Sequence, residues 1–201
     1  PLGTHIGNAL EVKDAIDVLA GRTQGDLLEI SLLLGSHMLV LAEKVKTLPE
    51  ARAMLENALS SGAGLRKLAE MIAAQGGDPR VVEDLSLLPQ AAVKRVMRAE
   101  TAGYLSAMDT TALGMAAQRM GAGRAKKSDM LDYSVGYVLH VRLGDEVTED
   151  TLLATLYARN EAEAEEAEKA IRKALTIAKE KPQTPKLWDA VVTAEGITYN
   201  R

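Results

Sequence analysis

Residues 135–158 read VGYVLHVRLGDEVTEDTLLATLYA, and this stretch decides the fold class of the chain. Apolar residues alternate with other residues along much of it, which is typical of β-strands that bury one face. Two turn signals, Gly144-Asp145 and Glu149-Asp150, divide the stretch into short segments. We therefore predict several strands joined by tight turns in this part of the chain.

The segments on either side extend these strands into a mixed domain. Before them, VKRVMRAETAGYLSAMD at 93–109 predicts two short strands around Gly103, and TALGMAAQRMG at 111–121 predicts a short helix. After them, residues 161–180 predict a helix, because acidic residues fill its first turns and basic residues its last, as the helix dipole favours. A strand-like LWDAVV follows near the end of the chain.

Residues 1 to about 92 have a helical pattern instead. Asn8, Asp26 and Thr47 each precede an apolar repeat and can cap a helix. The helix after Asp26 is apolar nearly all round, so we expect it to be buried. The chain is therefore predicted to be α+β, with a mostly helical part at 1–92 and a mixed α/β part at 93–201.

The composition of the chain argues against several classes of protein. Its 201 residues are 47% hydrophobic, enough for a core, but they carry a net charge of −4 and only 3% aromatic residues. Negative charge and few aromatic rings argue against a nucleic-acid partner. No apolar run reaches the roughly 20 residues that cross a bilayer, and no signal-peptide pattern opens the chain. With no cysteine for disulfides, we expect a cytoplasmic protein without a membrane partner.

Side chains that carry chemistry are sparse. His5, His37 and His140 each lack a second metal ligand on the same predicted element, so structural histidines are the favoured interpretation. GAGRAKK at 121–127 has two interpretations: an anion-binding loop, or a helix end closed by glycine with basic residues at the negative end of the dipole. The second is favoured, because no helix start follows the glycines.

A function of another class is a non-catalytic interaction module. The strands that follow Val135 resemble half of a biotinyl- or lipoyl-carrier fold, which needs a lysine at an exposed hairpin tip. No lysine lies between Lys127 and Lys169. A scaffold is therefore favoured, and a covalent biotinyl or lipoyl mass increment is the observation that would support a carrier.

Several longer motifs occur in order along the chain. They are PLG and IGNALEV within 1–12, LGSHMLVLAEK at 34–44, AAQGGD at 73–78, LPQA at 88–91, GYLSAMDTTALGMA at 103–116, GAGRAKKSDMLDYSVGYVLH at 121–140 and LGDEV at 143–147. Together they resemble the C-terminal half of the pyrimidine-nucleoside phosphorylases, the family that includes thymidine phosphorylase. The resemblance covers nearly the whole chain and weakens beyond about residue 182.

The resemblance implies a pentosyltransferase of pyrimidine salvage. Family members use inorganic phosphate to cleave the N-glycosidic bond of uridine or thymidine, and they release the base with ribose or deoxyribose 1-phosphate. It also implies a homodimer, no organic cofactor, and a fold in which 1–92 complete the central α/β domain while 93–201 form a C-terminal, hammerhead-like α/β domain. A thymidine-specific enzyme is the alternative, since YSVGY at 133–137 favours it whereas GNALEVK at 7–13 favours the broader enzyme.

The same resemblance implies that the substrate sites lie outside this chain. The family's phosphate loop, of the type Lys-His-Ser-Thr-Gly-Gly, and its base-binding arginine and lysine have no counterpart here. We therefore expect a segment before Pro1 in the parent enzyme, and we expect the chain alone to hold no catalytic or substrate-binding residue and to be inactive. The apolar face of the helix after Asp26 would then be covered by that segment or by self-association, or be partly disordered.

In some relatives a cation joins the phosphate loop to the opening turn, which is the segment before the helix that Asn8 can cap. The resemblance assigns its ligands to the backbone carbonyls of Leu2 and His5 and to the carboxylate of Asp14, which is oxygen chemistry suited to a monovalent or calcium-type cation. Asp14 departs from the family's glutamate, and its carboxylate reaches about 1.5 Å less far, the length of one C–C bond. The alternative is that Asp14 faces solvent on the first helix.

Overall fold

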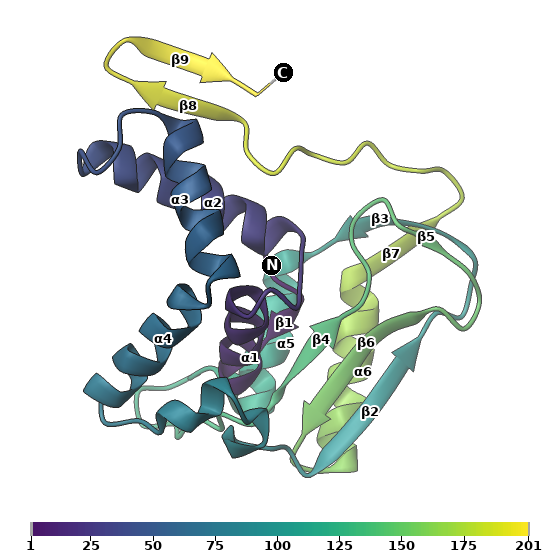
Figure 1. Cartoon of the computed structure of the whole chain (residues 1–201). Helices are drawn as coiled ribbons and strands as arrows, with labels where there is room; N and C mark the ends of the chain where they lie inside the picture. The colour runs from purple at the N-terminus through teal and green to yellow at the C-terminus, as the bar shows by residue number, and fades with distance from the viewer. Residues whose placement is uncertain (1, 201) are drawn as a thin grey trace.

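A computed structural model describes residues 2–200 of the chain (Figure 1). The first part is helical, and its helices are α1 (Asn8–Leu19), α2 (Asp26–Leu41), α3 (Leu48–Ser60) and α4 (Ala63–Ala74). Two short 3₁₀ turns, at Pro79–Val82 and Leu85–Leu87, lead into the second part. Each predicted helix start in this part is followed by a helix.

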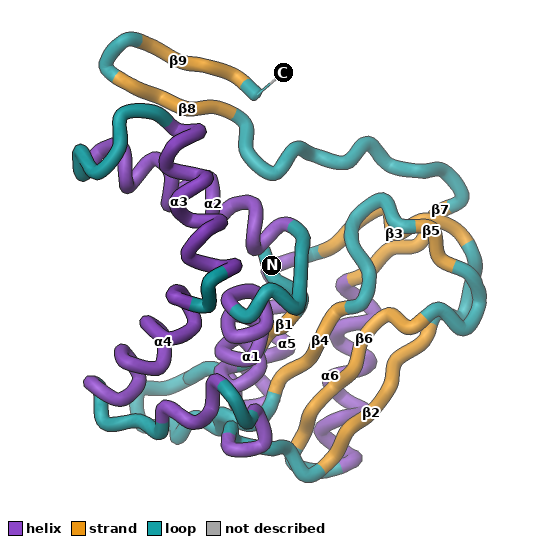
Figure 2. Tube along the Cα trace, in the orientation of Figure 1, coloured by secondary structure: helices purple, strands orange, loops and turns teal. Residues whose placement is uncertain are grey.

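The second part is built on antiparallel sheets (Figure 2). The larger sheet has the order β1-β4-β6-β2, with β1 (His5–Ile6), β4 (Gly136–Leu139), β6 (Leu152–Ala158) and β2 (Val93–Arg98). The smaller sheet has the order β5-β3-β7, with β5 (Glu146–Val147), β3 (Gly103–Met108) and β7 (Leu175–Ala178). The remaining elements are helices α5 (Thr110–Ala117) and α6 (Glu161–Ala174), a π-helical turn at Gln118–Ala122, and a hairpin of β8 (Ala190–Thr193) and β9 (Gly196–Tyr199). The predicted α+β fold class is confirmed.

The main hydrophobic core lies in the second part, where α5 and α6 pack with the sheets. Its buried aromatic ring is Tyr137, whose hydroxyl donates a 2.7 Å hydrogen bond to the Leu113 carbonyl. The large aliphatic members are Met97, Leu105, Leu139, Leu153, Leu156 and Ile171. The helical part has smaller buried clusters, one around Ile16 and one around Leu28. Packing is therefore strongest around the sheets.

The larger sheet crosses the predicted boundary at residues 92 and 93. β1 comes from the opening turn and pairs with β4, so that His5 lies opposite Val138. The Leu139 amide donates a 2.8 Å hydrogen bond to the Thr4 carbonyl. The opening turn is thus an edge of a sheet whose other strands all follow residue 92. The division of the chain into two domains stays a prediction.

Helix α6 is shorter than the sequence pattern indicates. It ends at Ala174 rather than at the predicted residue 180. Leu175 has extended backbone angles (φ −110°, ψ 130°), and the next residues, Thr176 and Ile177, are β-branched and favour a strand. Pairing of β7 with β3 therefore outweighs continuation of the helix.

The helix caps follow the prediction in one place and depart from it in another. Thr47 and Glu50 form a capping box at the start of α3, as the motif predicts. Helix α1 is preceded instead by Gly7, whose φ of 131° is accessible to glycine, and the predicted cap Asn8 makes no capping bond. The Asn8 side chain donates to the Ala122 carbonyl at 2.9 Å and so links the start of α1 to the π-helical turn that follows α5.

The expectation that α2 is buried is wrong for the described residues. Leu28 and Leu32 are buried, but Leu34, Met38 and Leu41 are 56%, 68% and 83% exposed. Their i, i+4, i+7 spacing puts these three on one apolar stripe. Such a stripe is typical of a surface that another segment or chain covers. None of the helices within residues 2–200 combines the length and apolar character needed to cross a membrane.

Glu168 joins α6 to β2. Its carboxylate accepts hydrogen bonds from Arg95 Nε at 2.6 Å and from Arg172 Nη2 at 2.9 Å. Burial raises the pKa of Glu168, but the hydrogen bonds and positive charges of Arg95 and Arg172 together outweigh burial and hold the pKa below its usual range. The ionised carboxylate therefore stabilises the fold.

Replacing Glu168 with glutamine is expected to lower the free energy of unfolding by about 1–2 kcal/mol near neutral pH, because charge-assisted hydrogen bonds are lost. A pKa below the usual 4.5 means that the stabilisation is present above that value and is lost as pH falls through the folded-state pKa. Urea unfolding near neutral pH and at about pH 3 should show a difference between wild type and Glu168→Gln that shrinks in acid. An equal difference at both pH values would contradict this.

Candidate functional site

The opening turn borders a cleft of about 470 Å³. The cleft is lined by Leu2, His5 and Asp14 from the turn and α1, and by Leu113 and Tyr137 from α5 and β4. It therefore lies where the helical part meets the larger sheet, and it gathers all three residues that the sequence predicts as cation ligands.

Asp14 is buried rather than solvent-facing. The residue is 5% exposed, and its Oδ2 accepts a 3.0 Å hydrogen bond from the Thr4 amide. Gly3 packs against the same carboxylate, so a side chain at that position would overlap with it. The alternative in which Asp14 faces solvent is wrong. Its carboxylate holds the opening turn against α1.

The His5 ring lies beside the Asp14 carboxylate. His5 Nδ1 is 2.9 Å from Thr4 Oγ1 and 3.4 Å from Asp14 Oδ2. Burial lowers the pKa of His5 more than the charge of Asp14 raises it, so the net pKa lies below the usual 6.5. The imidazole is therefore neutral at pH 7 and adds no positive charge to the turn.

The Leu2 carbonyl also has a partner within the chain. Arg142 Nη2 donates to it at 2.6 Å, across 140 positions of sequence. Arg142 lies in the loop between β4 and β5, where Asp145 Oδ2 accepts its backbone amide at 2.7 Å. Sequence reasoning missed Arg142, because nothing in its local pattern indicates a contact with the opening turn.

The predicted ligands suit a hard cation in atom type, but two of them already have protein donors. Leu2 accepts from Arg142, and Asp14 Oδ2 accepts from the Thr4 amide. A calcium-type cation takes roughly six to eight oxygens, and a guanidinium beside one of them repels it. These residues therefore fit a bound cation poorly in this arrangement. The cation at Leu2, His5 and Asp14 stays a prediction for the full enzyme.

Within residues 2–200, no group of three or more His, Cys, Asp or Glu side chains is placed to hold a metal ion. His140 Nε2 is 2.9 Å from Thr155 Oγ1, which supports its structural interpretation. His37 Nε2 is buried and makes no hydrogen bond in the described part of the chain.

The loop GAGRAKK at 121–127 is built as a helix end. The Asp129 carboxylate accepts hydrogen bonds from the amides of Ala125 (3.1 Å) and Lys126 (2.8 Å). Two of the amides that could have received an anion are thus bonded to Asp129. The geometry supports the interpretation of a helix end rather than an anion-binding loop.

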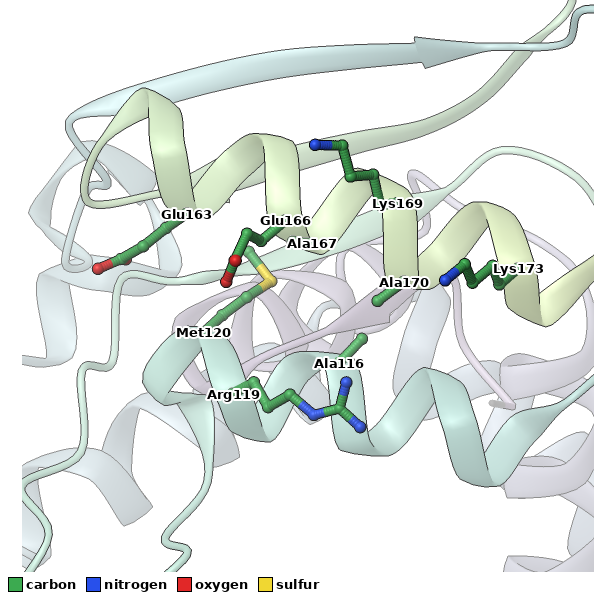
Figure 3. A pocket seen from close by; sticks show the side chains of 9 residues that line it. All are labelled: Ala116, Arg119, Met120, Glu163, Glu166, Ala167, Lys169, Ala170 and Lys173. Atoms are coloured by element: carbon green, nitrogen blue, oxygen red, sulfur yellow. The ribbon is translucent and has the colours of Figure 1, made fainter.

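A groove of about 320 Å³ lies between α5 and α6 (Figure 3). Alanine side chains and Met120 lie between the two helices, and none of the charged residues that line the groove is buried. Lys169 points away from the groove and donates to Glu165 at 2.6 Å, while Glu163 accepts from Arg159 at 2.8 Å. The groove is a crevice between packed helices, without the convergent polar groups of a ligand site.

The carrier alternative lacks an attachment residue. The turns that join β4, β5 and β6 lie within residues 140–151, which contain no lysine. The hairpin tips therefore offer no amine for a biotinyl or lipoyl group.

Comparison with known proteins tests whether the chain is similar to the phosphorylases or to a carrier module. Residues 104–178, from the second residue of β3 to the end of β7, match the family model of the pyrimidine nucleoside phosphorylase C-terminal domain. Over 161 residues the chain is 48% identical to the pyrimidine-nucleoside phosphorylase of Geobacillus stearothermophilus, and also to that of Bacillus subtilis (strain 168). The chain belongs to the pyrimidine-nucleoside phosphorylase family.

The similarity covers most of this chain but less than half of each relative. The 161 matched residues are 80% of this chain and 37% of the Geobacillus and Bacillus proteins. The pyrimidine-nucleoside phosphorylase of Staphylococcus aureus (strain USA300) is 43% identical over 178 residues, which are 89% of this chain and 41% of that protein. The chain thus spans about two fifths of the length of these phosphorylases.

Proposed function

We propose that this chain is the C-terminal part of an enzyme that cleaves pyrimidine nucleosides with inorganic phosphate. The observation that carries the proposal is the 48% identity over 161 residues to proteins named pyrimidine-nucleoside phosphorylase. The substrates are uridine and thymidine or deoxyuridine, and the products are the free base and ribose or deoxyribose 1-phosphate. The enzyme is thus a pentosyltransferase of pyrimidine salvage.

The reaction places simple demands on the protein. A phosphate oxygen bonds to the anomeric carbon while the C1′–N bond breaks, and the bonding electron pair leaves with the base, which takes up a proton. Catalysis requires phosphate held near the anomeric carbon and donors that stabilise the departing base. We assign these groups to the part of the family's length that this chain does not match, since it spans 37% of the Geobacillus phosphorylase.

In the proposed enzyme, the residues around the cleft hold the opening turn in place. The Asp14 carboxylate binds the Thr4 amide at 3.0 Å, and Arg142 binds the Leu2 carbonyl at 2.6 Å. Pairing of β1 with β4 fixes the same turn to the sheet. In the proposed enzyme this turn supports the phosphate-binding loop, and the apolar stripe on α2 is covered by the part of the enzyme that this chain does not match.

The proposed enzyme is a cytoplasmic homodimer that accepts both uridine and thymidine. Relatives at 43–48% identity are named for pyrimidine nucleosides in general, which favours the broader substrate range. A thymidine-specific enzyme is the alternative. Competition between uridine and thymidine for the full-length parent enzyme separates the two, because only the broader enzyme releases uracil.

A chimeric enzyme tests the proposed function. The matched segment of the Geobacillus stearothermophilus phosphorylase is replaced by the corresponding 161 residues of this chain. We expect the purified chimera to release uracil or thymine only when phosphate is present. The 201-residue chain alone, assayed at the same concentration, is expected to release neither base above background.

Two results would contradict the proposal in different ways. A chimera that is folded and dimeric but inert would argue against the family's activity for this chain. Base release by the chain alone, in a preparation free of other phosphorylases, would show that catalytic groups lie within the chain after all.

A further inference from the structure

Arg142 contacts one of the three groups that the resemblance assigns to a cation. One of the expected cation ligands, the Leu2 carbonyl, accepts a 2.6 Å hydrogen bond from Arg142 Nη2. A guanidinium is permanently charged and presents its donors in a rigid, planar arrangement. It therefore offers the Leu2 carbonyl the positive charge that a bound cation would offer.

We propose that Arg142 replaces the cation in this chain and tethers the opening turn to the sheet without a metal. The proposal starts from the cation ligands that the resemblance predicts. It does not depend on whether the enzyme is active. The guanidinium is a positioning group: it touches the turn and has no contact with the reacting atoms.

The loop that carries Arg142 is rigid. The Arg142 amide donates to Asp145 Oδ2 at 2.7 Å, and the Asp145 amide donates to the Arg142 carbonyl at 3.0 Å. The loop is also bonded to β3, because Gly144 donates to the Leu105 carbonyl at 2.8 Å and Leu105 donates to the Asp145 carbonyl at 2.9 Å. The backbone from which the guanidinium extends is therefore fixed by the scaffold.

The opening turn needs such a tether. β1 has only two residues, His5 and Ile6, and it forms the edge of the larger sheet. A strand of this length has little pairing energy of its own. The contacts that hold the turn include the β1–β4 pairing, the Asp14 bond to the Thr4 amide at 3.0 Å, and the Arg142 bond to the Leu2 carbonyl at 2.6 Å.

A metal cation and Arg142 would compete for the Leu2 carbonyl. A cation coordinated by that carbonyl lies within about 5 Å of the guanidinium, where two positive charges repel each other strongly. Removal of the guanidinium charge is thus expected to improve cation binding at the turn by about tenfold. Removal of a purely structural arginine would not change cation binding, so cation binding at the turn distinguishes the two roles.

Hydrogen exchange of the 201-residue chain tests the proposal. The Thr4 and Leu139 amides report on the turn, since Thr4 donates to Asp14 and Leu139 donates to the Thr4 carbonyl. Exchange is measured in EDTA and in millimolar CaCl₂ or KCl, for wild type, Arg142→Gln and Arg142→Lys. Arg98→Gln is the matched control, because Arg98 Nη1 also donates to a backbone carbonyl, that of Asp150, at 2.7 Å.

We expect wild-type exchange at both amides to be the same with and without added cation. Arg142→Gln should exchange about fivefold faster at both amides in EDTA, and calcium should slow it towards the wild-type rate. Arg142→Lys should lie between the two, and Arg98→Gln should match wild type at these amides.

Three outcomes would overturn the proposal. Slower wild-type exchange in calcium or potassium would mean that a cation binds beside Arg142. Unchanged exchange in Arg142→Gln would mean that the guanidinium does not tether the turn. A loosened Arg142→Gln that no cation restores would mean that Arg142 is a structural tether at a place where no cation binds.

Discussion

Replacing Gly136 with alanine is expected to lower the free energy of unfolding by about 3 kcal/mol or more. Gly136 begins β4 with a φ of +148°, a conformation that residues with a side chain rarely adopt. A Cβ at this position would overlap with the Ile6 carbonyl and would lie 2.9 Å from Gly7 Cα. Because both obstacles are backbone atoms, no side chain can move to relieve the overlap.

The neighbouring strand makes this glycine important for the candidate site. β1 approaches β4 closely where Gly7 and Gly136 face each other, and a Cβ on Gly7 would in turn overlap with the Val135 carbonyl. If β1 moved away to admit the new methyl group, the Leu139 bond to the Thr4 carbonyl would break. The opening turn would then lose its attachment to the sheet.

Guanidinium-induced unfolding followed by circular dichroism measures the predicted loss for Gly136→Ala. Gly114→Ala is the matched control, since Gly114 lies inside α5 and a Cβ there meets no atom within 4 Å. Alanine is a better helix former, so Gly114→Ala should be neutral or stabilise by up to about 1 kcal/mol. If Gly136→Ala were as stable as wild type to within about 0.5 kcal/mol, the close approach of β1 and β4 would be wrong.

Local sequence patterns predict the elements of this fold better than they predict the ends of those elements. The alternation and turn signals of 135–158 lead correctly to β4, β5 and β6, because a half-buried strand and its turns are both local features. The end of α6 is missed. Residues 175–178 can be helical or extended on their own, and it is pairing with β3 that makes them a strand.

The candidate site depends even more on contacts between distant residues. The motifs of the opening turn direct attention to Leu2, His5 and Asp14, and the structure places all three on one cleft. Yet Asp14 is a polar residue on a helix, which by itself favours an exposed position. It is buried because residues 3–5 fold over α1. The Arg142 bond to Leu2 joins residues 140 positions apart, so no local pattern contains it.

The apolar stripe of α2 shows a different limit. The sequence of α2 correctly predicts a helix, and its composition further predicts that this helix is buried. Met38 and Leu41 are nevertheless exposed in the described chain. A sequence pattern indicates the surroundings in which a helix is stable. These surroundings can include other segments or other chains, which the pattern itself does not contain.

Replacing Ile171 with alanine is expected to destabilise the chain by about 2–5 kcal/mol, the usual loss when a large aliphatic side chain is removed from a core. Ile171 is fully buried on α6, within the cluster that joins this helix to the sheets. Removal of the Ile171 side chain leaves a cavity where α6 packs. This helix contacts strands β2 and β6. Ile171→Val removes one methylene and should cost about 0.5–1.5 kcal/mol.

The cavity should also loosen the smaller sheet, because α6 continues directly into β7 and β7 pairs with β3. Hydrogen exchange of the β7 amides should therefore rise in Ile171→Ala together with the loss of stability. Lys169→Ala is the matched control on the same helix. The Lys169 side chain is exposed and forms a surface ion pair with Glu165, so its loss should change stability by no more than about 0.5 kcal/mol. Equal effects of Ile171→Ala and Lys169→Ala would mean that α6 does not pack on the sheets through Ile171.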